Sequence, residues 1–192
     1  YDYLTDFLEQ RGYDYEVLED KYFGRPNEVE EYVTPEGTAA FVRALRLPFK
    51  ARDYQLKGIY SAIKFRRKLL LSPTGSGKSL IIYALVRWHL LKKREILIIV
   101  PTVSLVEQLY KDFIEYGWNV RDVHKIMGGV EKYTDQPVVI STWQSIYKEP
   151  KKFFERFDVI IGDEAHQYKA KSLTGILTKC MDAKYRIGLT GT

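Results

Sequence analysis

An apolar run that leads directly into a glycine-rich turn and a helix start constrains the fold of this chain more than any other feature. Residues 69–71 (LLL) have the pattern of a strand, and residues 72–79 (SPTGSGKS) follow at once. Gly75 and Gly77 let the backbone curl so that its amides point inward, and the start of the next helix adds partial positive charge. The segment predicts a strand–turn–helix unit whose turn cradles phosphate oxygens.

The residues after the last glycine extend this prediction to a nucleoside triphosphate. Lys78 can reach the β- and γ-phosphates as a mobile cation, and the Ser79 hydroxyl can ligate Mg²⁺. One position departs from the usual pattern, which has glycine six residues before the lysine, where this chain has Ser72. We interpret the segment as a variant loop, so a second motif is needed to specify the kind of ATPase.

That second motif follows a short apolar stretch later in the chain. Residues 157–161 (FDVII) are typical of a buried strand, and Gly162 and residues 163–166 (DEAH) come next. A carboxylate at the end of a strand beside the loop can hold the Mg²⁺ shell, which suits Asp163, and Glu164 beside it can act as the base for water. Alone, this pair equally fits a solvated loop or a helix cap. The two motifs together, in this order, favour triphosphate binding.

Composition and charge indicate a globular protein with two unlike parts. The 192 residues are 45% hydrophobic and 29% charged, and no apolar run approaches membrane-spanning length. Residues 1–50 carry a net charge of −5 and residues 51–192 a net charge of +10, which predicts a boundary near residue 50 and a polyanion-binding surface beyond it. The single Cys180 excludes an internal disulfide, so we expect a cytoplasmic protein. The lack of a membrane-length apolar run predicts that it has no membrane partner.

From residue 51 onward, helical and strand patterns alternate. We expect strands at 68–72, 95–100, 121–126, 137–141, 157–161 and 185–189, with helices between them. Continuous apolar strands separated by helices predict an α/β fold, a mostly parallel sheet with helices on both faces. Residues 1–50 predict a helix–strand–helix segment of a truncated accessory domain. Because the chain lacks an initiator methionine and stops after an apolar strand, we expect a fragment of a longer protein.

Four further segments carry a resemblance to a known family. They are residues 52–55 (RDYQ), 100–102 (VPT), 140–145 (ISTWQS) and 188–192 (GLTGT). With the two motifs above, their order resembles the first, RecA-like motor lobe of P-loop NTPases that are superfamily 2 helicases of the DEAH/DExH type. Within that superfamily the chain most resembles phage recombination and repair helicases, and type III restriction translocases are close relatives.

The resemblance implies roles for individual residues. ATP would be bound by Arg52, Tyr54, Gln55, Pro73, Thr74, Gly75, Ser76, Gly77, Lys78 and Ser79, with Gln55 reading adenine and Mg²⁺ held by Ser79 and Asp163. The catalytic set would be Lys78, Asp163, Glu164 and His166, and Thr190 and Thr192 would couple the nucleotide site to the nucleic-acid site. The nucleic-acid backbone would be contacted by Pro101, Thr102, Gly128, Gly129, Thr142, Trp143 and Gln144. Trp143 would either stack on a base or pack beneath its loop.

The resemblance also implies partners and an activity. We expect an ATP-dependent, monomeric motor on DNA rather than RNA, in the host cytoplasm if a phage encodes it, completed by a second lobe with an arginine finger. The fragment alone is expected to bind ATP weakly and hydrolyse it slowly. Two alternatives remain open: a restriction-type translocase that does not separate strands, and a nucleic-acid-binding module with an inactive ATPase site. The last motif reads Leu-Thr-Gly-Thr, where the superfamily commonly has Ser-Ala-Thr.

Overall fold

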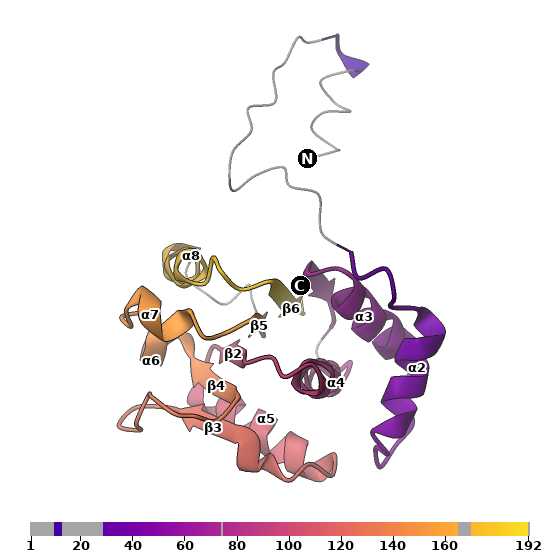
Figure 1. The fold of residues 1–192 in the computed structure, drawn as a ribbon, viewed down its shortest axis with the longest axis horizontal. Helices are drawn as coiled ribbons and strands as arrows, with labels where there is room; N and C mark the ends of the chain where they lie inside the picture. The colour runs from indigo at the N-terminus through magenta and orange to yellow at the C-terminus, as the bar shows by residue number, and fades with distance from the viewer. Residues whose placement is uncertain (1–9, 13–28, 74, 165–169, 192) are drawn as a thin grey trace.

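One parallel sheet organises the chain. The computed structural model describes residues 10–12, 29–73, 75–164 and 170–191, and these residues form a six-stranded sheet in the order β1-β6-β5-β2-β4-β3 (Figure 1). Every neighbouring pair is parallel, which confirms the predicted α/β class and makes the sheet parallel throughout. The strands are β1 (Arg67–Leu71), β2 (Ile96–Val100), β3 (Val123–Ile126), β4 (Val138–Thr142), β5 (Val159–Gly162) and β6 (Tyr185–Thr190).

Helices cover both faces of the sheet, as predicted. One face carries α3 (Asp53–Lys64), α4 (Lys78–Leu91) and α5 (Val103–Glu115), with α2 (Pro35–Ala44) packed outside α3. The other face carries α6 (Trp143–Ile146), α7 (Lys151–Phe154) and α8 (Ala170–Lys179). The two single-turn helices α6 and α7 were not expected from the sequence. None of the described helices is long and apolar enough to cross a membrane.

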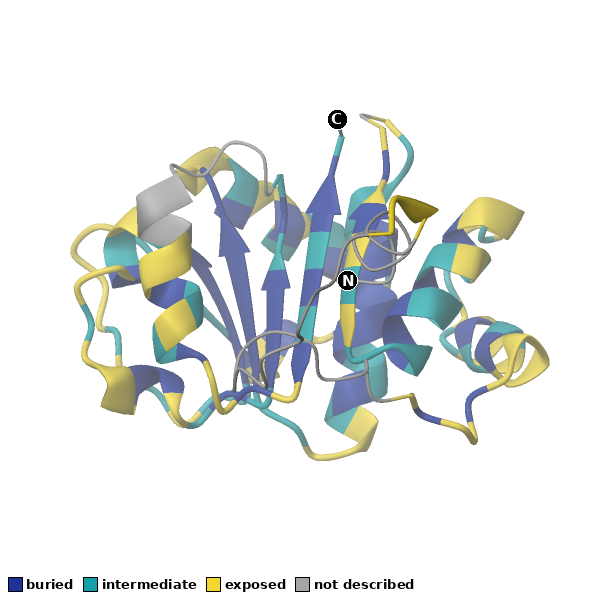
Figure 2. Cartoon of the chain, turned by 90° about the horizontal axis from the view of Figure 1, so that it is seen from above, coloured by how far each residue is buried: buried dark blue, intermediate teal, exposed yellow. Residues whose placement is uncertain are grey.

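Strand β2 lies between two hydrophobic cores and contributes to both. Its five residues are all fully buried. Ile96, Ile98 and Val100 belong to the core with α3, α4 and α5, and Leu97 and Ile99 belong to the core with α6, α7 and α8. This division follows from the two-residue repeat of a strand, which turns successive side chains to opposite faces. Figure 2 shows the buried strands in the middle, with their arrows all pointing the same way.

Local chemistry fixes several element boundaries. Thr34 caps α2, because its hydroxyl accepts a hydrogen bond from the Gly37 amide at 3.0 Å, and Pro35 occupies the first helical turn. The strand predicted at 121–126 begins only at Val123, which pairs with Val138, the first residue of β4. Residues 120–122 instead form a short 3₁₀ turn, since they have no strand residue opposite them.

The N-terminal part is described only from residue 29 onward, apart from residues 10–12. The predicted helix around residues 4–8, the strand at 13–18 and the loop at 24–26 lie outside the described residues. Val33 and α2 pack into the same core as α3 and α4. Glu30 accepts hydrogen bonds from Arg66 at 3.0 Å and from the Tyr185 hydroxyl. The boundary near residue 50 stays a prediction.

Candidate functional site: a cavity at the glycine-rich loop and a neighbouring groove

The two sequence motifs meet at one cavity. The loop after β1 opens α4, with Gly75 and Gly77 in the left-handed region at φ 79° and 78°. Parallel strands end at the same edge of the sheet, so the loop after β5 lies close to the loop after β1. The cavity has a volume of about 270 Å³ and is lined by Gly75, Gly77, Lys78, Ser79, Leu105, Gln108, Leu109, Asp112, Asp163 and Glu164.

Lys78 and Glu164 form an ion pair across this cavity, although 86 positions separate them in sequence. Their side chains are 11% and 14% exposed. Asp163 is 8% exposed, and its carboxylate accepts a hydrogen bond from the Glu164 amide at 2.9 Å. Glu164 has a positive φ of 49°, an uncommon backbone conformation for a non-glycine residue and one found at functional sites. The arrangement directs both acidic side chains toward the loop.

Ser79 is bonded to groups from α5 and its C-terminal end. Its hydroxyl lies 2.8 Å from the Tyr116 hydroxyl, and it also hydrogen-bonds the Asp112 carboxylate. Burial raises the pKa of Asp112, and the bond from Ser79 partly offsets this by lowering it. Sequence reasoning missed Asp112 and Tyr116. Helical spacing could have indicated Asp112, because Leu105, Gln108 and Asp112 lie on one face of the helix that follows Thr102.

The donor set at this cavity suits magnesium. Ser79 supplies a hydroxyl and Asp163 a carboxylate, and both are the hard oxygen donors that Mg²⁺ prefers. The described residues contain no group of three or more His, Cys, Asp or Glu side chains that could hold a metal by themselves.

The segment that opens α3 holds the glycine-rich loop in place. Gln55 is buried, its side-chain amide donates to the Ser76 carbonyl at 2.9 Å, and its carbonyl accepts from the Arg52 amide at 2.8 Å. The Tyr54 hydroxyl donates to the same Ser76 carbonyl at 3.0 Å. Ser72, which stands where glycine was expected, is buried, and its hydroxyl bonds that of Ser76 at 2.6 Å. The Ser72 side chain thus links the first part of the loop to its middle through a hydrogen bond.

A second cavity lies on the other side of the loop, between α3 and β1. Its volume is about 360 Å³ and its lining is Tyr54, Gly58, Leu70, Leu71, Ser72, Pro73, Ser76 and Ile81. Pro73 and Tyr54 therefore face a mostly apolar space next to the glycine-rich loop. Arg52 lies beside it, with its guanidinium 3.1 Å from the Tyr54 hydroxyl.

The predicted nucleic-acid residues, with one exception, line a single groove. Its volume is about 680 Å³, and the residues around it are Pro101, Thr102, Val103, Met127, Gly128, Gly129, Lys132, Thr142, Gln144 and Ser145. The Gln144 side chain donates to the Pro101 carbonyl at 3.2 Å, which ties the ends of β2 and β4 together. Trp143 does not line the groove. It packs against the core that contains α6, α7 and α8, with its ring centroid 6.0 Å from that of Tyr147.

The remaining predicted residues lie at or beyond the end of the described chain segments. Thr190 is buried at the end of β6, and its carbonyl accepts from the Ser72 amide at 2.7 Å, so it adjoins the start of the loop. Thr74, His166 and Thr192 lie outside the described residues, and their predicted roles stay predictions. The loop after β3, which sequence reasoning credited only with Gly128 and Gly129, also brings Met127 and Lys132 to the groove.

Comparisons with known proteins agree with this geometry. A family model described as "Type III restriction enzyme, res subunit" matches residues 48–192. The ATP-dependent DNA helicase UvsW of Enterobacteria phage T4 is 37% identical over 145 residues, which cover 72% of this chain and 29% of that protein. The DNA 3'-5' translocase XPB2 of Sulfurisphaera tokodaii is 28% identical over 141 residues, covering 73% of this chain and 30% of that protein.

Solved structures extend the likeness to the whole chain. The crystal structure of the bacteriophage T4 UvsW helicase superposes with a TM-score of 0.85 at 31% identity, covering all of this chain and 70% of that one. The Sulfolobus solfataricus SWI2/SNF2 ATPase core in complex with double-stranded DNA has a TM-score of 0.64 at 21% identity, covering 76% of this chain and 33% of that one, and shares the fold. The chain spans less than a third of the length of the curated relatives it matches.

Proposed function

Because this chain belongs to the family of the type III restriction enzyme res subunit, we propose that it is the nucleotide-binding lobe of an ATP-dependent helicase or translocase that acts on DNA in the cytoplasm. The observation that carries the proposal is the cavity at which the loop of Lys78 and Ser79 meets Asp163 and Glu164. The similarity of this chain to a protein described as an ATP-dependent DNA helicase supports DNA as the partner. We further propose that the full-length protein carries a second motor lobe and works as a monomer.

The ion pair between Lys78 and Glu164 suggests how ATP would engage the site. A triphosphate entering the cavity replaces Glu164 as the partner of Lys78, because its oxygens carry more charge. Glu164 is then released to accept a proton from water as the water oxygen attacks the γ-phosphorus and the bond to the β–γ bridging oxygen breaks. Ser79 and Asp163 would hold Mg²⁺, which neutralises phosphate charge when bound.

The adenine base is assigned to the segment that opens α3. Tyr54 and Arg52 border the apolar cavity beside the loop, which offers a flat base a hydrophobic wall. Gln55 retains one amide hydrogen and one carbonyl lone pair beyond its bonds to the loop and to Arg52, so it can both hold the loop and read the base edge.

The test is nucleotide binding by the 192-residue chain, measured with a fluorescent ATP analogue. Lys78→Ala should abolish binding, because it removes the cation for the β- and γ-phosphates. Lys111→Ala is the matched control, since that lysine is 76% exposed on α5 and its ion pair is with Glu115 of the same helix. Glu164→Gln should bind the analogue as the unaltered chain does, and in the full-length protein the same change should abolish ATP hydrolysis. Equal binding by the Lys78→Ala and unaltered chains would refute the proposal.

Helicase and translocase activities are separable on the full-length protein. Strand displacement from a forked DNA duplex indicates unwinding, whereas displacement of a triplex-forming strand without unwinding indicates translocation alone. Robust DNA-stimulated turnover by residues 1–192 would refute the expectation that this lobe needs a second one.

A further inference from the structure

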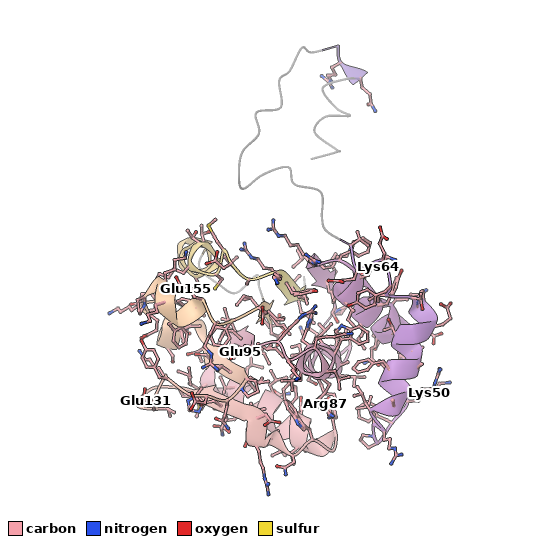
Figure 3. All side chains as sticks on the ribbon, in the orientation of Figure 1. Lys50, Lys64, Arg87, Glu95, Glu131 and Glu155 are labelled. Carbon is pink, nitrogen blue, oxygen red and sulfur yellow. The ribbon has the colours of Figure 1, made fainter. Side chains whose placement is uncertain are left out.

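Lys132 is the one charged residue among the described residues that line the groove. Among the residues that line the groove, all of which the structure describes, the others are apolar, small, or neutral hydroxyl and amide side chains. Neutral groups of this kind position a phosphate backbone, but attraction of the backbone comes mainly from lysine and arginine. The loop after β3 that carries Lys132 lies at the β3 end of the sheet, where Figure 3 labels the neighbouring Glu131.

Lys132 already has an anionic partner. Its ammonium lies 2.6 Å from the Glu149 carboxylate, and the two side chains are 38% and 13% exposed. A carboxylate at this distance takes one of the three N–H donors of the ammonium and neutralises part of its charge. A phosphate in the groove therefore competes with Glu149 for the charge of Lys132.

The backbone of Glu149, the less exposed partner of the pair, is held in place by further hydrogen bonds. The Lys179 ammonium, from α8, donates to the backbone carbonyls of Tyr147 and Glu149 at 2.7 and 2.8 Å. The Glu149 amide donates to the Ile146 carbonyl at 2.9 Å. These bonds hold the backbone that carries Glu149, so Lys132, on its longer and more exposed side chain, is the partner that can turn away.

We infer that Lys132 is the phosphate-binding cation of the groove and that Glu149 competes with nucleic-acid phosphate for it. The inference rests on the proposed function, because it requires a nucleic-acid backbone to lie in the groove. Binding exchanges the Glu149 carboxylate for a phosphate at the Lys132 ammonium. The carboxylate thus weakens binding, and it does so only through Lys132.

The experiment measures binding of a fluorescein-labelled oligothymidylate of about 20 nucleotides to the 192-residue chain by anisotropy at several salt concentrations. Lys132→Ala should weaken binding and reduce the slope of log affinity against log salt by about 0.7, the value for one single-strand contact. Glu149→Gln should tighten binding about three- to fivefold, the equivalent of a partly exposed ion pair. Lys151→Ala is the matched control, because Lys151 also pairs with a carboxylate, that of Asp182, outside the groove.

The double variant Lys132→Ala/Glu149→Gln separates competition from general repulsion. If Glu149 acts through Lys132, the gain from Glu149→Gln disappears when Lys132 is absent. An equal gain in both backgrounds, or a Lys132→Ala chain that binds like Lys151→Ala, would overturn this inference while leaving the proposed function intact. A chain that binds the ATP analogue but no oligonucleotide at any salt concentration would overturn both this inference and the proposed nucleic-acid partner.

Discussion

Gly77, at the start of α4, offers a quantitative test of how Gln55 holds the glycine-rich loop. A methyl group added at Gly77 would place its carbon 2.4 Å from the Gln55 side-chain nitrogen, at a residue whose φ is 78°. Gly75 is the matched control, since its φ is 79° but nothing lies within 4 Å of the added carbon. Both alanines incur the left-handed cost of about 1–2 kcal/mol. Only Gly77→Ala also displaces Gln55.

The extra cost follows from the bonds that Gln55 makes. Its displacement loses hydrogen bonds to the Ser76 carbonyl and from the Arg52 amide, each worth about 1 kcal/mol net. Gly77→Ala should therefore lower the free energy of unfolding by about 2 kcal/mol more than Gly75→Ala. Urea unfolding followed by circular dichroism measures both.

A double variant identifies the clash as the cause. Gln55→Ala removes the atom that the new methyl group meets, so in that background Gly77→Ala should cost no more than Gly75→Ala. If the two alanines are equally destabilising in the natural background, or if Gln55→Ala brings no relief, the reasoning about this contact is refuted.

Two further predictions concern buried titratable groups in the cores. Burial, reinforced by the charge of Arg94, lowers the pKa of His89 from 6.5 to about 3. At a pH between these two values the unfolded chain binds a proton at His89 and the folded chain does not. The free energy of unfolding should therefore fall by about 2–3 kcal/mol between neutral pH and about pH 4.5. His89→Gln, which keeps an acceptor for Arg94, should flatten that part of the urea-unfolding profile, and an unchanged profile would contradict the assignment. Burial raises the pKa of Cys180 to about 12, so this single thiol should react with a disulfide reagent only as the chain unfolds, and rapid labelling of the native chain would contradict its place in the core.

Sequence patterns predicted the parts of the site that local rules control. The turn at residues 72–79 and the acidic pair at 163–164 each follow a buried strand, and in a parallel sheet strand ends meet, so their approach could be foreseen. The same rule brought Thr102 and Gln144 to one groove. The roles assigned to these residues stay predictions.

Packing between distant elements decided what the sequence did not reveal. Asp112 and Tyr116 reach Ser79 only because of the rotation of α5 about its axis, and Lys132 reaches the groove only through the path of the loop after β3. The 3₁₀ turn at residues 120–122 replaced the predicted strand start because pairing with β4 begins at Val123. Each of these outcomes depends on contacts that lie far apart in sequence.

Because the six strands run in the same direction, the edge of the sheet where they begin lies away from the candidate site and is suited to attaching a probe. Both cavities and the groove lie where strands end, whereas Lys184 is exposed just before β6 begins, at the opposite edge. Six strand residues separate the two edges there, a span of about 20 Å. Because Cys180 is buried, Lys184→Cys would provide a single accessible thiol. A dye or a tether attached there leaves the edge with the two cavities and the groove clear for single-molecule observation.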